Sequence, residues 1–398
     1  MSAATYESTK TTSNLAKQVR ANFQTYAILV ALIVIWGFFY AMTDGAYLKG
    51  QNFSNLFRQM TVTALLACGM VLVIVTGGID LSVGKLAGFV SVVVAYAQAR
   101  IWTQVLPDQE LLTTTMSVLI GLAVGILYGM LQGYIVSFLG VPSFIVSLGG
   151  MWILNGLILI VTEGKTIPAN QPMFSVIAQG YLPKTVGWII AGLVVLALIY
   201  LMISSRRKKQ RYGFDLNPLY MDVIRTAILS LVVVGYVFMV NQYNGPQIPV
   251  MLLIVVAVIV AYVSDNTRFG RYAYAIGGNR EAARLSGVNI RRNIFLIFVL
   301  MGFLCGVSGI TLASYVGYGT IAAGAGYELD AIASCILGGT STLGGEGTIF
   351  GAMVGALIMA SLSNGLQMMN VQPAWQYVLK GMVLVLAVLM DVYLKKNR

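Results

Sequence analysis

The sequence predicts an all-α, polytopic membrane protein with about 12 transmembrane helices. Hydrophobic residues make up 58% of the chain and charged residues only 10%, whereas soluble domains carry roughly 25% charged residues. Apolar runs of about 20 residues recur along the chain, and each is long enough to cross a hydrocarbon core of roughly 30 Å. No small-residue cleavage site follows the first run, so this run predicts a retained span and not a signal peptide.

Twelve apolar segments predict the individual helices. The stretch 1–23 is polar and 395–398 is basic, so residues 24–394 are expected to form one transmembrane domain between two cytoplasmic tails. Its main cytoplasmic loops would be 204–222 and 264–293. Because 248–263 and 328–340 are short, ten spans are the alternative to twelve. The spans are expected at about residues 24–42, 61–77, 82–99, 116–138, 143–162, 185–203, 223–240, 248–263, 294–316, 328–340, 348–366 and 375–393.

The basic residues predict which side each loop faces. The N-terminal tail carries three, the 204–222 loop five, the 268–292 segment six and the C-terminal tail three. Because Lys and Arg accumulate in cytoplasmic loops, these 17 charges predict that both termini are cytoplasmic. The net charge of +11 is therefore a topology signal, and no nucleic-acid partner is expected. The opposite side holds only Lys49, Arg58, Arg100, Lys165 and Lys184.

The residue types present argue against catalysis by this chain. It has no histidine, which excludes a histidine proton relay, a histidine metal site and every Ser-His or Cys-His nucleophile. Two segments approach the phosphate-binding loop pattern and fail it. The first, 78–86, has five residues between its glycines and ends in leucine, and the second, 159–166, lacks the first glycine. We expect no enzymatic activity, metal or cofactor here. The cysteines, expected to pack between helices, are Cys68, Cys305 and Cys335.

Two glycine-rich segments interrupt the apolar pattern, at 77–85 and at 338–347. Irregular backbone at membrane depth is tolerated where protein buries it or where it lines a cavity. Broken helices at corresponding places in two halves of a chain predict a transport path, which makes Ser82, Thr340 and Ser341 candidate path residues. The alternative is a pair of tight re-entrant turns between packed helices.

Polar side chains within the apolar zone are further path candidates. Asp80 and Lys85 are costly there, so they either face a cavity, where they would bind a coupling ion or line the path, or form a local ion pair. Amides within the spans either line the path or hydrogen-bond neighbouring helices. These amides are Gln132, Asn155, Asn364 and Gln367. The acids expected to face outside water at helix ends are Glu163, Glu328 and Asp330.

The two halves of the chain share sequence features. The Gly-x-x-x-Gly pattern at 121–125 recurs at 351–355, an offset of 230, and Pro142 matches Pro373 at an offset of 231. In the predicted topology, the first member of each pair belongs to a helix that runs inward and the second to a helix that runs outward. The sequence therefore predicts two inverted halves.

The segment 268–292, RFGRYAYAIGGNREAARLSGVNIRR, carries six arginines and one acid. Its centre predicts a short helix on the membrane face, in which two alanines allow close approach of a partner ATPase and a glycine ends the helix. The alternative is a solvated connector that contacts only lipid headgroups. This short helix is therefore a candidate docking element for the ATPase. Its candidate residues are Asn279, Arg280, Glu281, Ala282, Ala283, Arg284 and Gly287.

Four motifs in the same order resemble the membrane permease subunits of bacterial monosaccharide ABC importers, in the ribose, galactose and xylose branch. The length and the additional segment at 204–263 most resemble the xylose and multiple-sugar permeases. The motifs are GGIDLSVGKLAGF at 77–89, FLGVPSFIVSLGGMWILNG at 138–156, AIGGNREAARLSGVNI at 275–290 and ILGGTSTLGGEGTIFGAMVGALIM at 336–359.

The resemblance implies the fold of the type II importers, with spans 2–5 and 9–12 as the inverted halves. It also implies a bacterial inner-membrane location, a second permease copy and a periplasmic sugar-binding protein. A cytoplasmic tandem ABC ATPase would bind ATP and Mg²⁺ and contact 279–287. The substrate would be a monosaccharide, with xylose as the first candidate and arabinose, galactose or several sugars as alternatives.

Two other functions are open from the residues themselves. A secondary sugar transporter driven by an ion gradient would also use broken helices and inverted halves. It would normally place a cluster of ionisable groups deep in the membrane, and only Asp80, Lys85 and Lys380 are candidates. A scaffold or receptor subunit without transport is disfavoured, because a passive anchor gains nothing from glycine-rich breaks.

Overall fold

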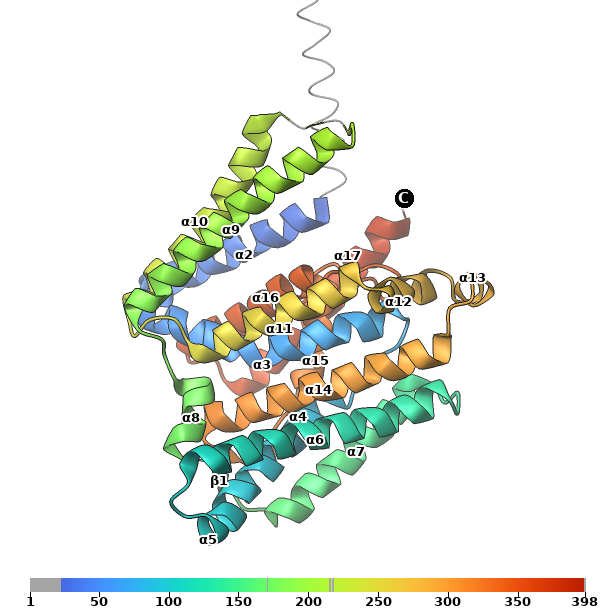
Figure 1. Ribbon diagram of the computed structural model, residues 1–398. Helices are drawn as coiled ribbons and strands as arrows, with labels where there is room; N and C mark the ends of the chain where they lie inside the picture. Colours follow the sequence, from blue (N-terminus) through green and yellow to red (C-terminus); the bar gives the residue numbers. More distant parts are fainter. Residues whose placement is uncertain (1–22, 170, 215, 217, 397–398) are drawn as a thin grey trace, which may run out of the picture.

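The computed structural model describes residues 23–396 except 170, 215 and 217, so residues 1–22 of the predicted 1–23 tail and the last two residues lie outside the described range. The described chain is helical almost throughout, which confirms the all-α class (Figure 1). A short antiparallel sheet pairs β1 (Ile167–Pro168) with β2 (Tyr318–Gly319). The helices are α2 (Phe23–Met42), α3 (Gly50–Val75), α4 (Val83–Tyr96), α5 (Thr103–Val105), α6 (Glu110–Ser137), α7 (Ser143–Thr162), α8 (Pro172–Gln179), α9 (Lys184–Arg211), α10 (Leu219–Asn241), α11 (Ile248–Asn266), α12 (Arg268–Gly278), α13 (Arg280–Leu285), α14 (Ile290–Val316), α15 (Tyr327–Leu337), α16 (Ile349–Met368) and α17 (Pro373–Lys396), with a 3₁₀ turn at Ala46–Leu48 and a π-helical segment at Ala97–Trp102.

Nine of the described helices are long and apolar enough to cross a membrane, counting α4 together with its continuation to Val105. α2 and α17 contain shorter apolar stretches, Ile28–Met42 and Pro373–Leu389. Of the two short apolar segments, 248–263 becomes a full-length helix, α11, whereas 328–340 does not become a full span, because α15 has only 11 residues. At about 1.5 Å per residue, it covers roughly half of a 30 Å core. The chain reaches α15 through turns at 317–326, which pack against α4.

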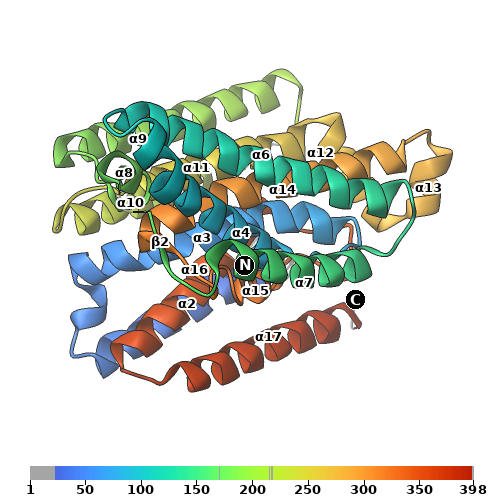
Figure 2. The same cartoon turned by 90° about the horizontal axis from the view of Figure 1, so that it is seen from below.

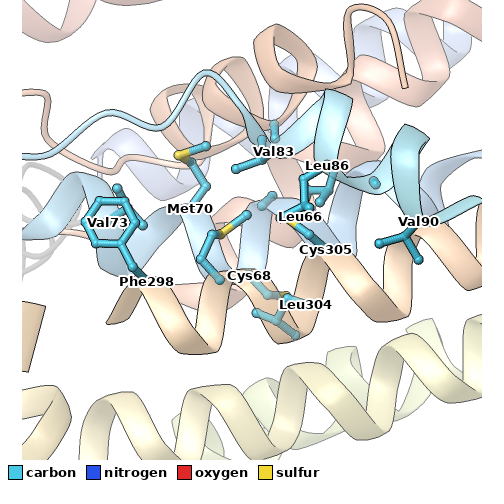
Figure 3. Close-up of a cluster of buried hydrophobic side chains, with 14 of the residues drawn as sticks. Leu66, Cys68, Met70, Val73, Val83, Leu86, Val90, Phe298, Leu304 and Cys305 are labelled. Carbon is cyan, nitrogen blue, oxygen red and sulfur yellow. The ribbon is translucent and has the colours of Figure 1, made fainter. Parts of the chain in front are cut away.

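α3 is the central helix of the bundle. Of its 26 residues, 20 are buried, as expected for a helix that is surrounded by protein and not by lipid. Figure 3 shows Cys68 and Met70 of α3 beside Phe298 and Cys305 of α14. All three cysteines are buried, and Cys335 Sγ lies 3.4 Å from the carbonyl oxygen of a residue on α3. Their predicted packing between helices is confirmed.

α6 and α14 run antiparallel with their backbones in contact. A Cβ atom on Gly125 would lie 2.9 Å from the amide nitrogen of Gly306, and one on Gly302 would lie 2.8 Å from Gly129 Cα. Side chains at these positions would separate the helices, so glycine permits the close approach, as in other membrane-helix contacts. The Gly-x-x-x-Gly pattern at 121–125 therefore belongs to the packing of the two halves against each other.

The neighbours of the helices agree with two inverted halves, α3–α4–α6–α7 and α14–α15–α16–α17. α6 lies along α14, and α16 lies along α3. The α3–α16 pair is also antiparallel, because Asn52 hydrogen-bonds Asn364 at one end and Val75 O accepts from Gly345 N at the other. Each half thus places its third helix against the first helix of the other half.

The prediction that the two glycine-rich segments occupy corresponding places is wrong. Segment 77–85 joins α3 to α4, whereas 338–347 joins α15 to α16. In the inverted arrangement the counterpart of the first segment is 317–326, which connects α14 to α15. Composition shows that a segment is glycine-rich, but it does not show which connection of a repeat the segment occupies.

The basic segments gather at one end of the helix bundle. Figure 1 shows α13 and the α6–α7 connection at the right, the C-terminal end of α17 above them and the α9–α10 turn at the top, with α5 and α8 at the lower left. The predicted 204–222 loop is mostly helical, because α9 continues to Arg211 and α10 starts at Leu219. This α9–α10 hairpin lies at the side of the bundle, and only 11% of the apolar window in each of its helices is buried.

Candidate coupling helix and polar path

α13 is a six-residue helix whose ends are defined by its own sequence. Asn279 Oδ1 accepts a hydrogen bond from Ala282 N at 2.9 Å, which caps the helix start. Gly287 adopts a left-handed conformation at φ 80°. Its N–H donates to Arg284 O, and the next N–H donates to Ala283 O, at 3.0 and 3.1 Å. These two bonds form a Schellman motif, which satisfies the last carbonyl groups of the helix.

The surface of α13 is largely free for a partner. Ala283 is its only buried residue, and this side chain anchors the helix to the bundle. Glu281 and Arg284 form an ion pair at 2.5 Å with 65% of each side chain exposed, so the pair adds little stability. Leu285 is 78% exposed. A short helix therefore presents three charged side chains, a small Ala282 and an apolar Leu285 to the surroundings.

α12 connects α13 to the centre of the bundle. Tyr274 OH donates to Gly347 O at 2.9 Å, and burial raises the pKa of this phenol above its usual value of about 10, so it remains a donor. Gly277 lies against Val75 O, and the same oxygen accepts from Gly345 N at 2.8 Å. The C-terminal end of α12 thus contacts the end of α3 and the 338–347 segment. Because α12 leads directly into α13, a displacement of α13 would move these contacts.

Asp80 and Ser82 form a buried polar group with Gln132 of α6. Ser82 donates to Asp80 Oδ1 from its backbone N at 2.9 Å and from its hydroxyl at 2.6 Å. Ser82 Oγ also lies 3.2 Å from Gln132 Oε1. Asp80 is only 2% exposed. The predicted alternative of an Asp80–Lys85 ion pair is wrong, because the Asp80 carboxylate accepts its hydrogen bonds from Ser82 in the same turn.

Lys85 instead faces the acidic side of α15. The Glu328 carboxylate reaches α4 beside Gly84 and interacts electrostatically with Lys85. Two residues further along α15, Asp330 accepts from Lys380 Nζ of α17 at 2.9 Å, with 17% and 21% of the two side chains exposed. The prediction that Glu328 and Asp330 face outside water is wrong, since both are half-buried within the bundle. Figure 2 shows α15 between α7 and α17 on this side of the molecule.

The remaining predicted path residues lie apart from this charged group. Asn364 Oδ1 accepts from Asn52 at 2.9 Å, at the end of the bundle opposite α13. Thr340 and Ser341 are buried in the 338–347 segment, near the C-terminal end of α12. Asn155 is half-buried on α7. The chain therefore does not bring the seven candidates into one site but distributes them along the bundle.

Known proteins are similar to this chain over most of its length. A family model described as the permease component of the branched-chain amino acid transport system matches residues 52–388. This chain belongs to that permease family. No solved structure matches it significantly.

Named relatives of this permease cover nearly its whole length. The xylose transport system permease protein XylH of Haemophilus influenzae is 40% identical over 94% of this chain and 98% of its own. The galactose/methyl galactoside import permease protein MglC of the same organism is 30% identical over 92% and 93%. The ribose import permease protein RbsC of Escherichia coli is 31% identical over 96% and 98%. The resemblance to sugar permeases is confirmed.

Sequence reasoning missed several contacts of this permease. Tyr274 was one aromatic residue in a basic segment, and nothing nearby in the sequence signals its bond to Gly347. The Asp330–Lys380 pair joins two helices 50 positions apart in the chain. A signal for this pair existed, since an acid and a base each interrupt an apolar segment. Their pairing depends on helix packing that the sequence does not display.

Proposed function

We propose that this permease carries a monosaccharide across the bacterial inner membrane as the transmembrane subunit of an ABC importer. The observation that carries the proposal is the full-length similarity to proteins named as sugar permeases, at 30–40% identity. Xylose is the first candidate, because the identity is 40% to XylH and 30% to MglC. The relatives and the exposed α13 favour a partner-driven importer over a transporter driven by an ion gradient.

In this proposal α13 is the coupling helix and docks on a cytoplasmic tandem ATPase, which binds ATP and Mg²⁺. Ala282 and Leu285 would contact the ATPase, while Ala283 holds the helix to the permease. Because α12 meets Val75 and Gly345, motion of α13 would reach the end of α3 and the 338–347 segment. Repacking there would change access to the path, as expected for alternating access around a fixed site.

The opposite end of the bundle would receive the periplasmic sugar-binding protein, with 44–58, 100–115 and 163–184 as the contact segments. A second permease copy would complete the transporter, with both termini cytoplasmic as the positive-inside rule indicates. Within each chain, the half-buried charges of α4, α15 and α17 are candidates for sugar contacts, because ionisable groups at membrane depth usually serve a pathway. The Asp80–Ser82 group and Asn364 would lie nearer its two ends.

The coupling assignment is tested by the double variant Glu281→Ala/Arg284→Ala. We expect normal membrane insertion, no sugar uptake and no ATPase in a mild-detergent pull-down of the tagged permease. The matched control is Glu163→Ala/Lys165→Ala, which removes an even more exposed acid–base pair at the opposite end and should retain the ATPase. Full uptake by the Glu281/Arg284 variant would contradict the role of α13.

Substrate choice needs a separate experiment. Cells that lack their own sugar importers and express the complete system should accumulate labelled xylose in competition with unlabelled xylose, arabinose, galactose and ribose. Uptake driven by an imposed proton or sodium gradient in vesicles that contain this permease alone would support the gradient-driven alternative.

A further inference from the structure

A cavity of about 900 Å³ lies beside α13, at the end of the bundle where the basic segments gather. Its walls come from α13 and the start of α14, the α6–α7 connection at 136–144 and the turn at 76–79. The volume is at the upper end of the range for small-molecule sites, about 300–1,000 Å³. Inorganic phosphate would leave most of it empty.

The charged side chains that line this cavity are all arginines. They are Arg280, Arg284 and Arg291, and among the residues that the structure describes no acid lines the cavity. Glu281 pairs with Arg284, whereas neither Arg280 nor Arg291 forms an ion pair within the described chain. Two guanidinium groups therefore remain available for an anionic ligand, and arginine binds phosphate oxygens with paired donors.

The opposite wall of the cavity is apolar and exposed. Phe138, Leu139 and Phe144 of the α6–α7 connection are 43%, 61% and 49% exposed. Apolar side chains at the end of two membrane-spanning helices are covered by acyl chains or by a partner. A wall of this kind facing three arginines matches a molecule with a phosphate at one end and hydrocarbon at the other.

We propose that this cavity binds the headgroup of an anionic phospholipid from the cytoplasmic leaflet. The phosphate lies between Arg280 and Arg291, and the acyl chains leave along Phe138, Leu139 and Phe144. Basic pockets between transmembrane helices on the cytoplasmic side bind anionic headgroups in this manner. A bound lipid joins α13 to the α6–α7 connection and so limits the movement of α13.

The adjacent arginines of α14 provide a matched test. Arg291 lines the cavity and Arg292 does not, although both side chains are exposed. The purified full-length permease in detergent is titrated with phosphatidylglycerol or phosphatidylcholine, and bound lipid is counted by native mass spectrometry. We expect saturable binding of phosphatidylglycerol that is about five- to tenfold weaker in Arg291→Gln and unchanged in Arg292→Gln. Equal weakening in both variants would mean non-specific attraction and would overturn the site.

Two further measurements separate the alternatives. Inorganic phosphate at millimolar concentration should not displace phosphatidylglycerol, and efficient displacement would overturn the lipid assignment in favour of a soluble anion. Leu139→Glu changes an exposed side chain and places an acid on the apolar wall, so it should also weaken phosphatidylglycerol binding without loss of folding in gel filtration. Unchanged binding in this variant would refute the proposed course of the acyl chains. These outcomes do not depend on the ATPase or the transported sugar.

Discussion

Gly302→Ala should destabilise the permease through the α6–α14 contact. The added Cβ would lie 2.8 Å from Gly129 Cα and closer still to Gly125 O, whereas optimal contacts between carbon atoms are about 3.5–4.0 Å. Both neighbours are backbone atoms, so the strain is relieved only when the helices move apart by a sizeable fraction of an ångström. Overpacking of this kind costs about 1–3 kcal/mol. Because both contacts are with backbone atoms, the cost lies at the upper end of this range. Alanine gains only about 0.5–1 kcal/mol over glycine in a helix, which leaves a net loss of about 2 kcal/mol.

The measurement is equilibrium unfolding in mixed detergent micelles. The matched control is Gly192→Ala in α9, where the added Cβ would meet nothing within 4 Å, so it should unfold no more easily than the wild type. If Gly302→Ala and Gly192→Ala unfold at the same denaturant concentration, the backbone contact between α6 and α14 does not limit stability and the reasoning is refuted.

Three further outcomes follow from single contacts. Lys380→Met should lower the free energy of unfolding by roughly 1–3 kcal/mol, because it leaves the half-buried Asp330 without its partner. Adding Asp330→Asn to the Lys380→Met chain should recover part of this loss. Additive losses from the two substitutions in the unfolding assay would contradict the pairing. Tyr274→Phe removes the hydrogen bond to Gly347 O, so it should lower the free energy of unfolding by about 0.5–1.5 kcal/mol and increase amide hydrogen exchange around Gly347. Unaltered exchange would argue against a stabilising role for this hydrogen bond. Maleimide should label the three buried cysteines only after SDS denaturation, so rapid labelling of the native protein would exclude their placement between helices.

Local features of the site could be predicted from the sequence. Asn279 and Gly287 mark the two ends of α13 because a capping amide and a left-handed glycine act on backbone groups within a few residues. The positions of most helices follow from hydropathy for a similar reason. In a membrane each segment must satisfy its own backbone hydrogen bonds, so a long apolar run has few alternatives to a helix.

Interactions between distant segments could not be predicted in the same way. The sequence suggested Lys85 as the partner of Asp80, but the Asp80 carboxylate binds Ser82, and Lys85 faces Glu328 across a contact between α4 and α15. The cavity beside α13 likewise combines walls from three separate segments of the chain. Neither arrangement produces a recognisable pattern in the amino-acid sequence.

The sequence by itself determined the all-α membrane class, the segments that become helices, the grouping of the basic loops and the glycine that ends α13. Only the tertiary structure decided that α15 is a half-length helix, that the two glycine-rich segments occupy different connections, and that α3 is the centre of the bundle. The physical reason is the range of the interactions. Hydropathy and capping act along one stretch of chain, whereas burial and ion pairing depend on which helices become neighbours after folding.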